Sequence, residues 1–122
     1  MALININYES KTLGMPVMIN AIIPQGRGNY KTLYLLHGMG GDYTTWITKS
    51  RVADYVDNTD IAVIMISGDN KCYVDNVHGR KYFTFLTEEL IETCTNWFGL
   101  SRDRKDRYIA GMSMGGYGAV HA

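Results

Sequence analysis

Residues 108–122 read YIAGMSMGGYGAVHA and place a glycine two positions from Ser113 on either side. A short apolar segment precedes this G-x-S-x-G pattern, and a glycine-rich segment typical of a helix start follows it. In that setting the pattern predicts a nucleophile elbow, a tight strand-to-helix turn that projects the serine hydroxyl above a sheet. Such a turn sets Ser113 at a helix N-terminus, where free N–H groups favour a developing negative charge. Glycine-rich turns also occur without catalysis, whereas phosphate binding is a weak alternative because no Gly-Lys-Ser/Thr follows.

Two near-continuous apolar runs lie upstream of that turn. They occupy residues 31–38 and 61–68 and indicate strands that are buried on both faces. A third short strand, residues 106–113, leads into the turn. Residues 3–10 alternate apolar and polar side chains, which predicts a strand at a sheet edge, and residues 15–24 predict its hairpin partner.

Two segments between these strands have helical character. The first covers about residues 46–55. The second covers about residues 81–98, where apolar side chains recur at steps of three and four residues and predict a stripe that packs on a sheet. The stripe consists of Phe83, Leu86, Leu90, Cys94 and Trp97. Gly99 is well suited to end this helix.

The order of these segments predicts the architecture. Buried strands that alternate with amphipathic helices imply an α/β fold, with a mostly parallel sheet covered by helices on both faces. A chain of 122 residues is long enough for one small domain with a real core, and no repeat or linker divides it. We therefore expect residues 1–122 to form one domain, or the first part of one.

Charge and composition exclude several classes of protein. Twelve basic and twelve acidic side chains cancel, and no Lys/Arg cluster indicates nucleic-acid binding. Cys72 and Cys94 are not spaced as a metal or redox pair and are most simply free thiols. The N-terminus shows no leader, and no window is apolar enough to span a bilayer. We expect a cytoplasmic, soluble protein with a small, weakly polar substrate; self-association is left open.

A second glycine-rich motif, His37-Gly38-Met39-Gly40-Gly41, directly follows the first buried strand. An acyl-transfer enzyme must stabilise the oxyanion of its tetrahedral intermediate with preorganised N–H donors. In hydrolases with a nucleophile elbow one donor belongs to the residue after the serine, here Met114. The other lies in a loop of this kind, here at Met39 with Gly40 close by. Either motif alone is a weak signal, but the two in this order predict an acyl hydrolase.

With both motifs in place, the chain resembles the N-terminal half of the esterase D and tributyrin esterase group of α/β-hydrolases, which includes S-formylglutathione hydrolases. The resemblance runs through ESKTLGMPVMINAIIP, LYLLHGMGGDYTTW, YVDNVHGRKYFTFLTEEL and YIAGMSMGGYGA. It implies hydrolysis of short-chain acyl esters or small thioesters, with no metal and no organic cofactor. It also implies Ser113 as the nucleophile and the N–H groups of Met39 and Met114 as the oxyanion hole.

The chain departs from this pattern after the serine. In this fold an acid and then a histidine follow the nucleophile in sequence. After Ser113 the chain contains neither Asp nor Glu, and its one later histidine, His121, lies down the expected helix away from the turn. His37 is interpreted as a structural residue of its loop, and His78 as an exposed one. We therefore expect a fragment truncated after the elbow and inactive alone; the alternatives are a non-catalytic relic and a subunit completed by a partner chain.

Two aromatic residues are candidates for the substrate pocket. Tyr73 follows the second buried strand, at the strand end where such sheets bind ligands, and Trp46 begins the first helix. Their alternative interpretations are an exposed loop residue and an anchor of the helix to the core. The sequence does not decide between ester and thioester substrates.

Overall fold

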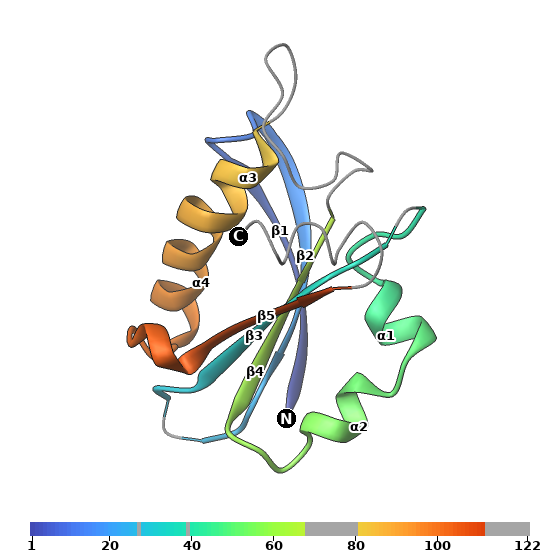
Figure 1. The fold of residues 1–122 in the computed structure, drawn as a ribbon, viewed down its shortest axis with the longest axis vertical. Helices are drawn as coiled ribbons and strands as arrows, with labels where there is room; N and C mark the ends of the chain where they lie inside the picture. Colours follow the sequence, from blue (N-terminus) through green and yellow to red (C-terminus); the bar gives the residue numbers. More distant parts are fainter. Residues whose placement is uncertain (27, 39, 68–80, 112–122) are drawn as a thin grey trace.

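A single mixed sheet forms the centre of the computed structural model, which describes residues 1–26, 28–38, 40–67 and 81–111 (Figure 1). The sheet has five strands in the order β1-β2-β4-β3-β5. These strands are β1 (Ala2–Ser10), β2 (Met15–Ile23), β3 (Lys31–Leu36), β4 (Ile61–Ile66) and β5 (Arg107–Gly111). The expected hairpin and the position of its first strand at the sheet edge are both confirmed.

Four of the five strands run in the same direction. β3 pairs in parallel with both β4 and β5, while β2 is antiparallel to its neighbours β1 and β4. β3 and β4 lie inside the sheet, and their apolar runs are almost completely buried. This burial agrees with the prediction from their continuous apolar sequences.

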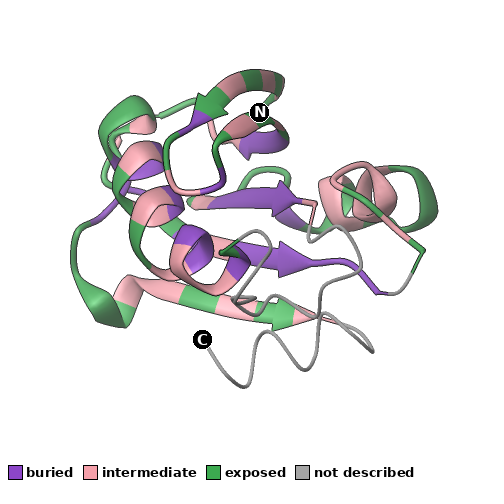
Figure 2. Ribbon diagram, turned by 90° about the horizontal axis from the view of Figure 1, so that it is seen from above, coloured by how far each residue is buried: buried purple, intermediate pink, exposed green. Residues whose placement is uncertain are grey.

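Helices cover both faces of the sheet, as predicted (Figures 1 and 2). The helical segments are α1 (Thr45–Lys49), α2 (Val52–Val56), α3 (Tyr82–Thr84), the π-helix η1 (Phe85–Leu90), α4 (Ile91–Phe98) and the 3₁₀ turn η2 (Arg104–Asp106). The segment from α3 to α4 packs on one face through a large apolar cluster. A smaller cluster joins α1 and α2 to the other face.

The expected helix over residues 46–55 is wrong in one respect, because it is two short helices. Ser50 has extended backbone angles and separates α1 from α2. Its hydroxyl donates to the carbonyl of Trp46 and accepts the backbone N–H of Val52 at 3.3 Å. A serine side chain that replaces backbone hydrogen bonds on both sides of it in this way ends one helix and begins another.

The expected helix over residues 81–98 contains a π-helical segment, η1, in its first half. The wider π turn changes which side chains face the sheet. Leu86, Leu90 and Cys94 of the predicted stripe are buried, but Tyr82 and Phe85 join them in place of Phe83. Trp97, predicted to be core, is 47% exposed and contacts Tyr8 edge-on. Gly99 ends the helix with a left-handed φ of 63°, as expected.

A carboxylate fastens the β1–β2 hairpin to this helical segment. Glu89 accepts hydrogen bonds from the Tyr8 hydroxyl at 2.7 Å and the Thr12 backbone N–H at 2.8 Å. Burial acts to raise the pKa of the Glu89 carboxyl, but the hydrogen bonds from Thr12 and Tyr8 outweigh it and hold the pKa below its usual value. Cys94, a free thiol buried near this contact, has its pKa raised to about 12 by burial.

Candidate active site

The carboxyl ends of three parallel strands meet in one row across the sheet. Leu36, the last residue of β3, pairs with Gly111 at the end of β5 on one side and with Ile66 at the end of β4 on the other. The His37–Gly41 loop therefore leaves the sheet beside the point where the chain runs from Gly111 toward Ser113. Sheets of this kind bind ligands outside the carboxyl ends of their strands. The two sequence motifs therefore begin where a shared site requires them.

The loop after β3 opens with a buried histidine. His37 is 1% exposed, and its Nδ1 lies 2.6 Å from the carbonyl oxygen of Gly38. A turn follows, in which the backbone N–H of Gly41 donates to the same carbonyl at 3.1 Å. The interpretation of His37 as a residue that orders the loop is confirmed by this contact.

Gly40 and Gly41, two of the described glycines of the loop, serve different purposes. Gly40 has a φ of 80°, a conformation that residues with a Cβ rarely adopt, and it has open space around its α-carbon. A Cβ at Gly41 would lie 2.6 Å from the Thr45 hydroxyl and 3.1 Å from the Cβ of His37. Gly40 thus permits the turn of the chain, and Gly41 permits the close return of the loop.

Beyond the turn, Tyr43 fastens the loop to two strands. Its backbone N–H donates to the hydroxyl of Ser67 at 3.0 Å, directly after β4. Its carbonyl accepts from the side chain of Asn20 at 3.4 Å, and Asn20 in turn accepts from Asn5 at 3.0 Å. Because Asn20 is only 7% exposed, these bonds also satisfy a buried amide inside β2.

The loop continues into α1 through a network of local hydrogen bonds. Asp42 accepts from the hydroxyl of Thr44 and from its backbone N–H, and these hydrogen bonds hold the pKa of Asp42 below its usual range. The backbone N–H of Asp42 donates to the Thr45 hydroxyl at 2.9 Å. Trp46 then donates its Nε1–H to the carbonyl of Leu36 at 3.2 Å, which joins the end of the loop to its start.

Comparison with known proteins gives the family. Residues 10–122 match the Esterase family of putative esterases. The chain belongs to this family. It is 36% identical to an acetyl esterase of Caldicellulosiruptor saccharolyticus, over 98% of this chain and 50% of that protein. The chain thus spans about half the length of this curated relative, and the resemblance expected from the motifs is confirmed.

Solved structures agree with the family match. A fluorophosphonate-binding serine hydrolase of Staphylococcus aureus superposes with a TM-score of 0.91 at 35% identity, over 96% of this chain and 49% of that one. An S-formylglutathione hydrolase of the same organism superposes with a TM-score of 0.86 at 35% identity and the same coverage. The esterase-family chain therefore has the α/β-hydrolase fold, as its sequence predicted.

The esterase-family chain contains two predicted site residues within its described part, Gly40 and Trp46. Trp46 is half-buried and joined to β3, so its role as an anchor is confirmed, while contact with substrate stays a prediction. The other predicted site residues lie outside the described residues; these are Ser113, Met114, Met39 and Tyr73. The sequence analysis missed Asn20 and Ser67, although a buried amide within an apolar strand was an available signal.

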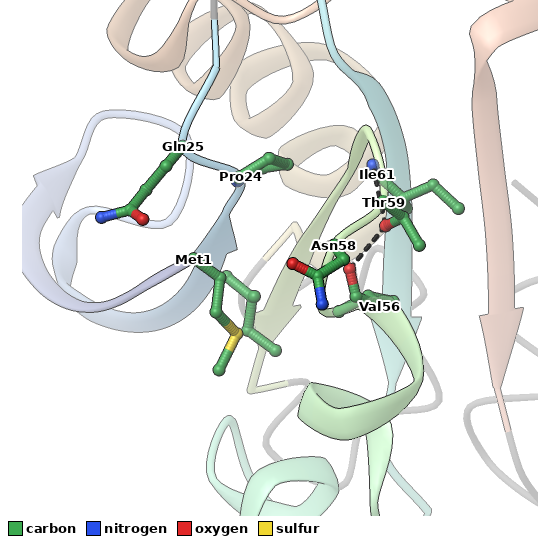
Figure 3. Close-up of a pocket in the computed structure, with 8 residues that line it drawn as sticks. Met1, Pro24, Gln25, Val56, Asn58, Thr59 and Ile61 are labelled. Atoms are coloured by element: carbon green, nitrogen blue, oxygen red, sulfur yellow. Dashed lines mark hydrogen bonds between the residues drawn. The ribbon is translucent and has the colours of Figure 1, made fainter.

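One pocket of this esterase-family chain lies at the amino end of β4, far from the strand ends where the two motifs begin. Figure 3 shows it between Met1, Gln25 and Asn58, beside the amino end of β4. There the Thr59 hydroxyl accepts from the backbone N–H of Ile61 at 3.2 Å and donates to the carbonyl of Val56. The length of β4 separates Ile61, which lines this pocket, from the carboxyl end of the strand by about 17 Å, at ~3.3 Å per residue.

Within the described ranges no three His, Cys, Asp or Glu side chains gather as metal ligands. No helix in the same ranges is long and apolar enough to cross a membrane. The expected absence of a cofactor and the cytoplasmic location stay predictions.

Proposed function

We propose that this chain supplies the nucleophile and the oxyanion hole of a serine carboxylesterase that hydrolyses short-chain acyl esters. The observation that supports it most strongly is the pairing of Leu36 with Gly111. The oxyanion-loop motif, residues 37–41, and the elbow motif, residues 111–115, begin at these neighbouring strand ends. Membership of the Esterase family and the name of the acetyl esterase relative support the same chemistry.

In this mechanism Ser113 attacks the ester carbonyl carbon while a histidine accepts its proton. The N–H groups of Met39 and Met114 donate to the oxyanion of the tetrahedral intermediate. Collapse of that intermediate expels the alcohol, which takes the proton from the histidine and leaves an acyl-serine. Water, deprotonated by the same histidine, then attacks the acyl-serine and releases the carboxylic acid together with the free Ser113 hydroxyl.

The histidine and its acidic partner are proposed to follow this chain in the complete protein. Triad residues of α/β-hydrolases occur in the order Ser, Asp or Glu, His, and no acid follows Ser113 within the 122 residues. The curated relative is about twice as long as the part that this chain matches. Sequencing the gene beyond the codon for Ala122 tests this: an open frame that supplies an Asp or Glu and then a His supports it, and an authentic stop codon contradicts it.

Hydrolysis of S-formylglutathione is the second candidate, favoured by the 35% identity to the S. aureus enzyme of that name. The product of the complete gene should be assayed on ethyl acetate and on S-formylglutathione, each with a matched Ser113→Ala variant. A higher kcat/KM for the thioester would favour this second candidate. Loss of both activities in Ser113→Ala is expected for either substrate, whereas retention would remove the serine from the mechanism.

A further inference from the structure

A second hollow lies at the carboxyl end of β4, in the row of strand ends that also contains Leu36 and Gly111. We define the β2–η1 pocket as the space of about 260 Å³ between the first half of β2, the carboxyl end of β4, Tyr43 and the start of the α3–η1 helix. Trp46, the described candidate for the substrate pocket, does not line it. The β2–η1 pocket is therefore not a site to which Trp46 contributes.

The walls of the β2–η1 pocket are mainly apolar. Val17 and Ile19 contribute from β2, and Tyr82 and Phe85 contribute from the facing helix. Ile19, Tyr82 and Phe85 are each 1% exposed, which makes this wall part of the packed core. A cavity of ~150 Å³ with apolar walls is enough to bind benzene, so this pocket has room for a ring or a branched alkyl group.

The pairing of the strands explains why the pocket opens at this edge. β2 pairs with β4 through Asn20, Ala21 and Ile22. This register sets Ile19 opposite Ile66, the last residue of β4, so Met15–Met18 extend past the end of β4. In Figure 1 this extension rises beside α3, above the carboxyl end of β4. The pocket thus lies beside the carboxyl ends of the parallel strands, on the side of the sheet away from β5.

The oxyanion-loop motif and the pocket share a wall. Tyr43, which follows that motif, lines the pocket, and so does Ser67, whose hydroxyl holds the Tyr43 backbone N–H. Ile66 and Gly111 occupy the same row of the sheet, two strand spacings or about 10 Å apart. An acetyl group is too short to span a distance of this size, but a longer chain or a ring on a linker is not.

We propose that the β2–η1 pocket binds an apolar group of the ester or thioester substrate, with at least the bulk of a phenyl ring or a branched alkyl chain. This proposal rests on the proposed esterase function. It makes Val17 a specificity-determining residue, because its half-buried side chain lines the pocket and packs at the margin of the apolar core rather than within it.

The test compares kcat/KM for small and bulky esters in the product of the complete gene. Ethyl acetate is the small reference; ethyl phenylacetate enlarges the acyl side, and benzyl acetate enlarges the alcohol side. Val17→Phe fills the pocket and Val17→Ala enlarges it. Val52→Phe is the matched control, because it makes the same change at a half-buried valine of α2 that does not line the pocket.

We expect Val17→Phe to lower kcat/KM at least about 10-fold for one bulky ester, the size of effect that a lost apolar subsite produces, and to leave ethyl acetate within about twofold. The affected series identifies the side of the carbonyl that carries the apolar group. Equal effects on all three esters, or no effect on any, would overturn the proposal. If Val17→Phe does not fold, Val17→Ala decides, since it must change the ratio of bulky to small ester while Val52→Ala does not.

Failure of the pocket and failure of the esterase function give different results. Hydrolysis of ethyl acetate that is lost in Ser113→Ala establishes the function independently of Val17. Hydrolysis of that kind without any Val17 effect rejects the pocket alone. Absence of Ser113-dependent hydrolysis of every ester rejects the function, and the proposal for the pocket falls with it.

Discussion

Leu36 and Gly111 are register partners at the carboxyl ends of the parallel strands β3 and β5. The residues that follow them in sequence are those of the oxyanion-loop motif and the nucleophile motif. The starting points of two motifs more than 70 residues apart along the chain are therefore neighbours in the sheet. Strand pairing, fixed by burial of β3 on both faces, is what brings these starting points together.

Gly41→Ala is expected to lower kcat at least about 10-fold while the protein stays folded. The new Cβ would lie 2.6 Å from the Thr45 hydroxyl and 3.2 Å from the carbonyl oxygen of Gly38, so the loop must shift. A displaced oxyanion donor costs ~10²-fold or more in kcat. Steady-state kinetics together with a thermal melt measure both effects. Unchanged kcat in a folded variant would contradict the assignment of this loop.

Gly40→Ala and Gly40→Asn form a matched pair that tests backbone conformation rather than space. The φ of 80° at Gly40 disfavours alanine, whereas no atom lies within 4 Å of a Cβ at this position. Asparagine tolerates positive φ better than alanine. We expect Gly40→Asn to retain several-fold more activity than Gly40→Ala. Equal losses in both variants would indicate that the side-chain space, and not φ, limits this position.

Ser67→Ala is expected to lower kcat several-fold and to destabilise the protein by ~1 kcal/mol, because Tyr43 loses the acceptor for its backbone N–H. Ser67→Thr keeps the hydroxyl and is the control that should restore kcat. Separate values of kcat and KM, measured beside the free energy of unfolding, distinguish a positioning role from general destabilisation. If Ser67→Ala changed stability alone, the link between the loop and β4 would have no catalytic consequence.

Asn20→Leu is expected to act on the same loop from the β2 side. The substitution removes the donor to the Tyr43 carbonyl and the acceptor for the Asn5 side chain. Both partners then lose a hydrogen bond within the protein. We expect a loss of stability of ~1–2 kcal/mol from the unsatisfied groups. Urea unfolding of Asn20→Leu beside Asn5→Leu separates the two bonds, since Asn5→Leu leaves the Tyr43 contact intact.

Glu89→Gln tests the contact between the hairpin and η1 as a function of pH. Because the folded-state pKa of Glu89 is lowered, its carboxylate stabilises the fold above the unfolded pKa of ~4.3, and this stabilisation is lost as the pH falls through the folded value. We expect Glu89→Gln to cost ~1 kcal/mol at pH 7, a modest figure because the carboxylate is partly exposed. Urea unfolding at pH 7 and pH 3 should show the difference shrinking at pH 3; a constant difference would contradict the charge-based explanation.

The predictable parts of the fold were those set by long apolar runs and by glycine. Continuous burial indicated β3 and β4, alternation indicated the edge strand β1, and Gly99 marked a helix end that the structure forms with a left-handed φ. These signals are local, so they can be recognised without knowledge of the tertiary contacts.

The parts that escaped prediction depend on contacts made after the chain has folded. The break at Ser50 arises because its hydroxyl competes with the helix backbone, an option that many serines do not take. The π-helical segment η1 lets Phe85 reach the core and leaves Trp97 to pack against Tyr8. Within the candidate site, the bond between Tyr43 and Ser67 joins residues 24 apart and has no signature in either local sequence.

The most direct test of the central claim is covalent labelling of the complete gene product by a fluorophosphonate, which reacts only with an activated serine. The account predicts rapid, stoichiometric labelling that maps to Ser113, is abolished in Ser113→Ala and is slowed in Gly41→Ala. Labelling that persists in Ser113→Ala, or a folded wild-type protein that is not labelled, would contradict it.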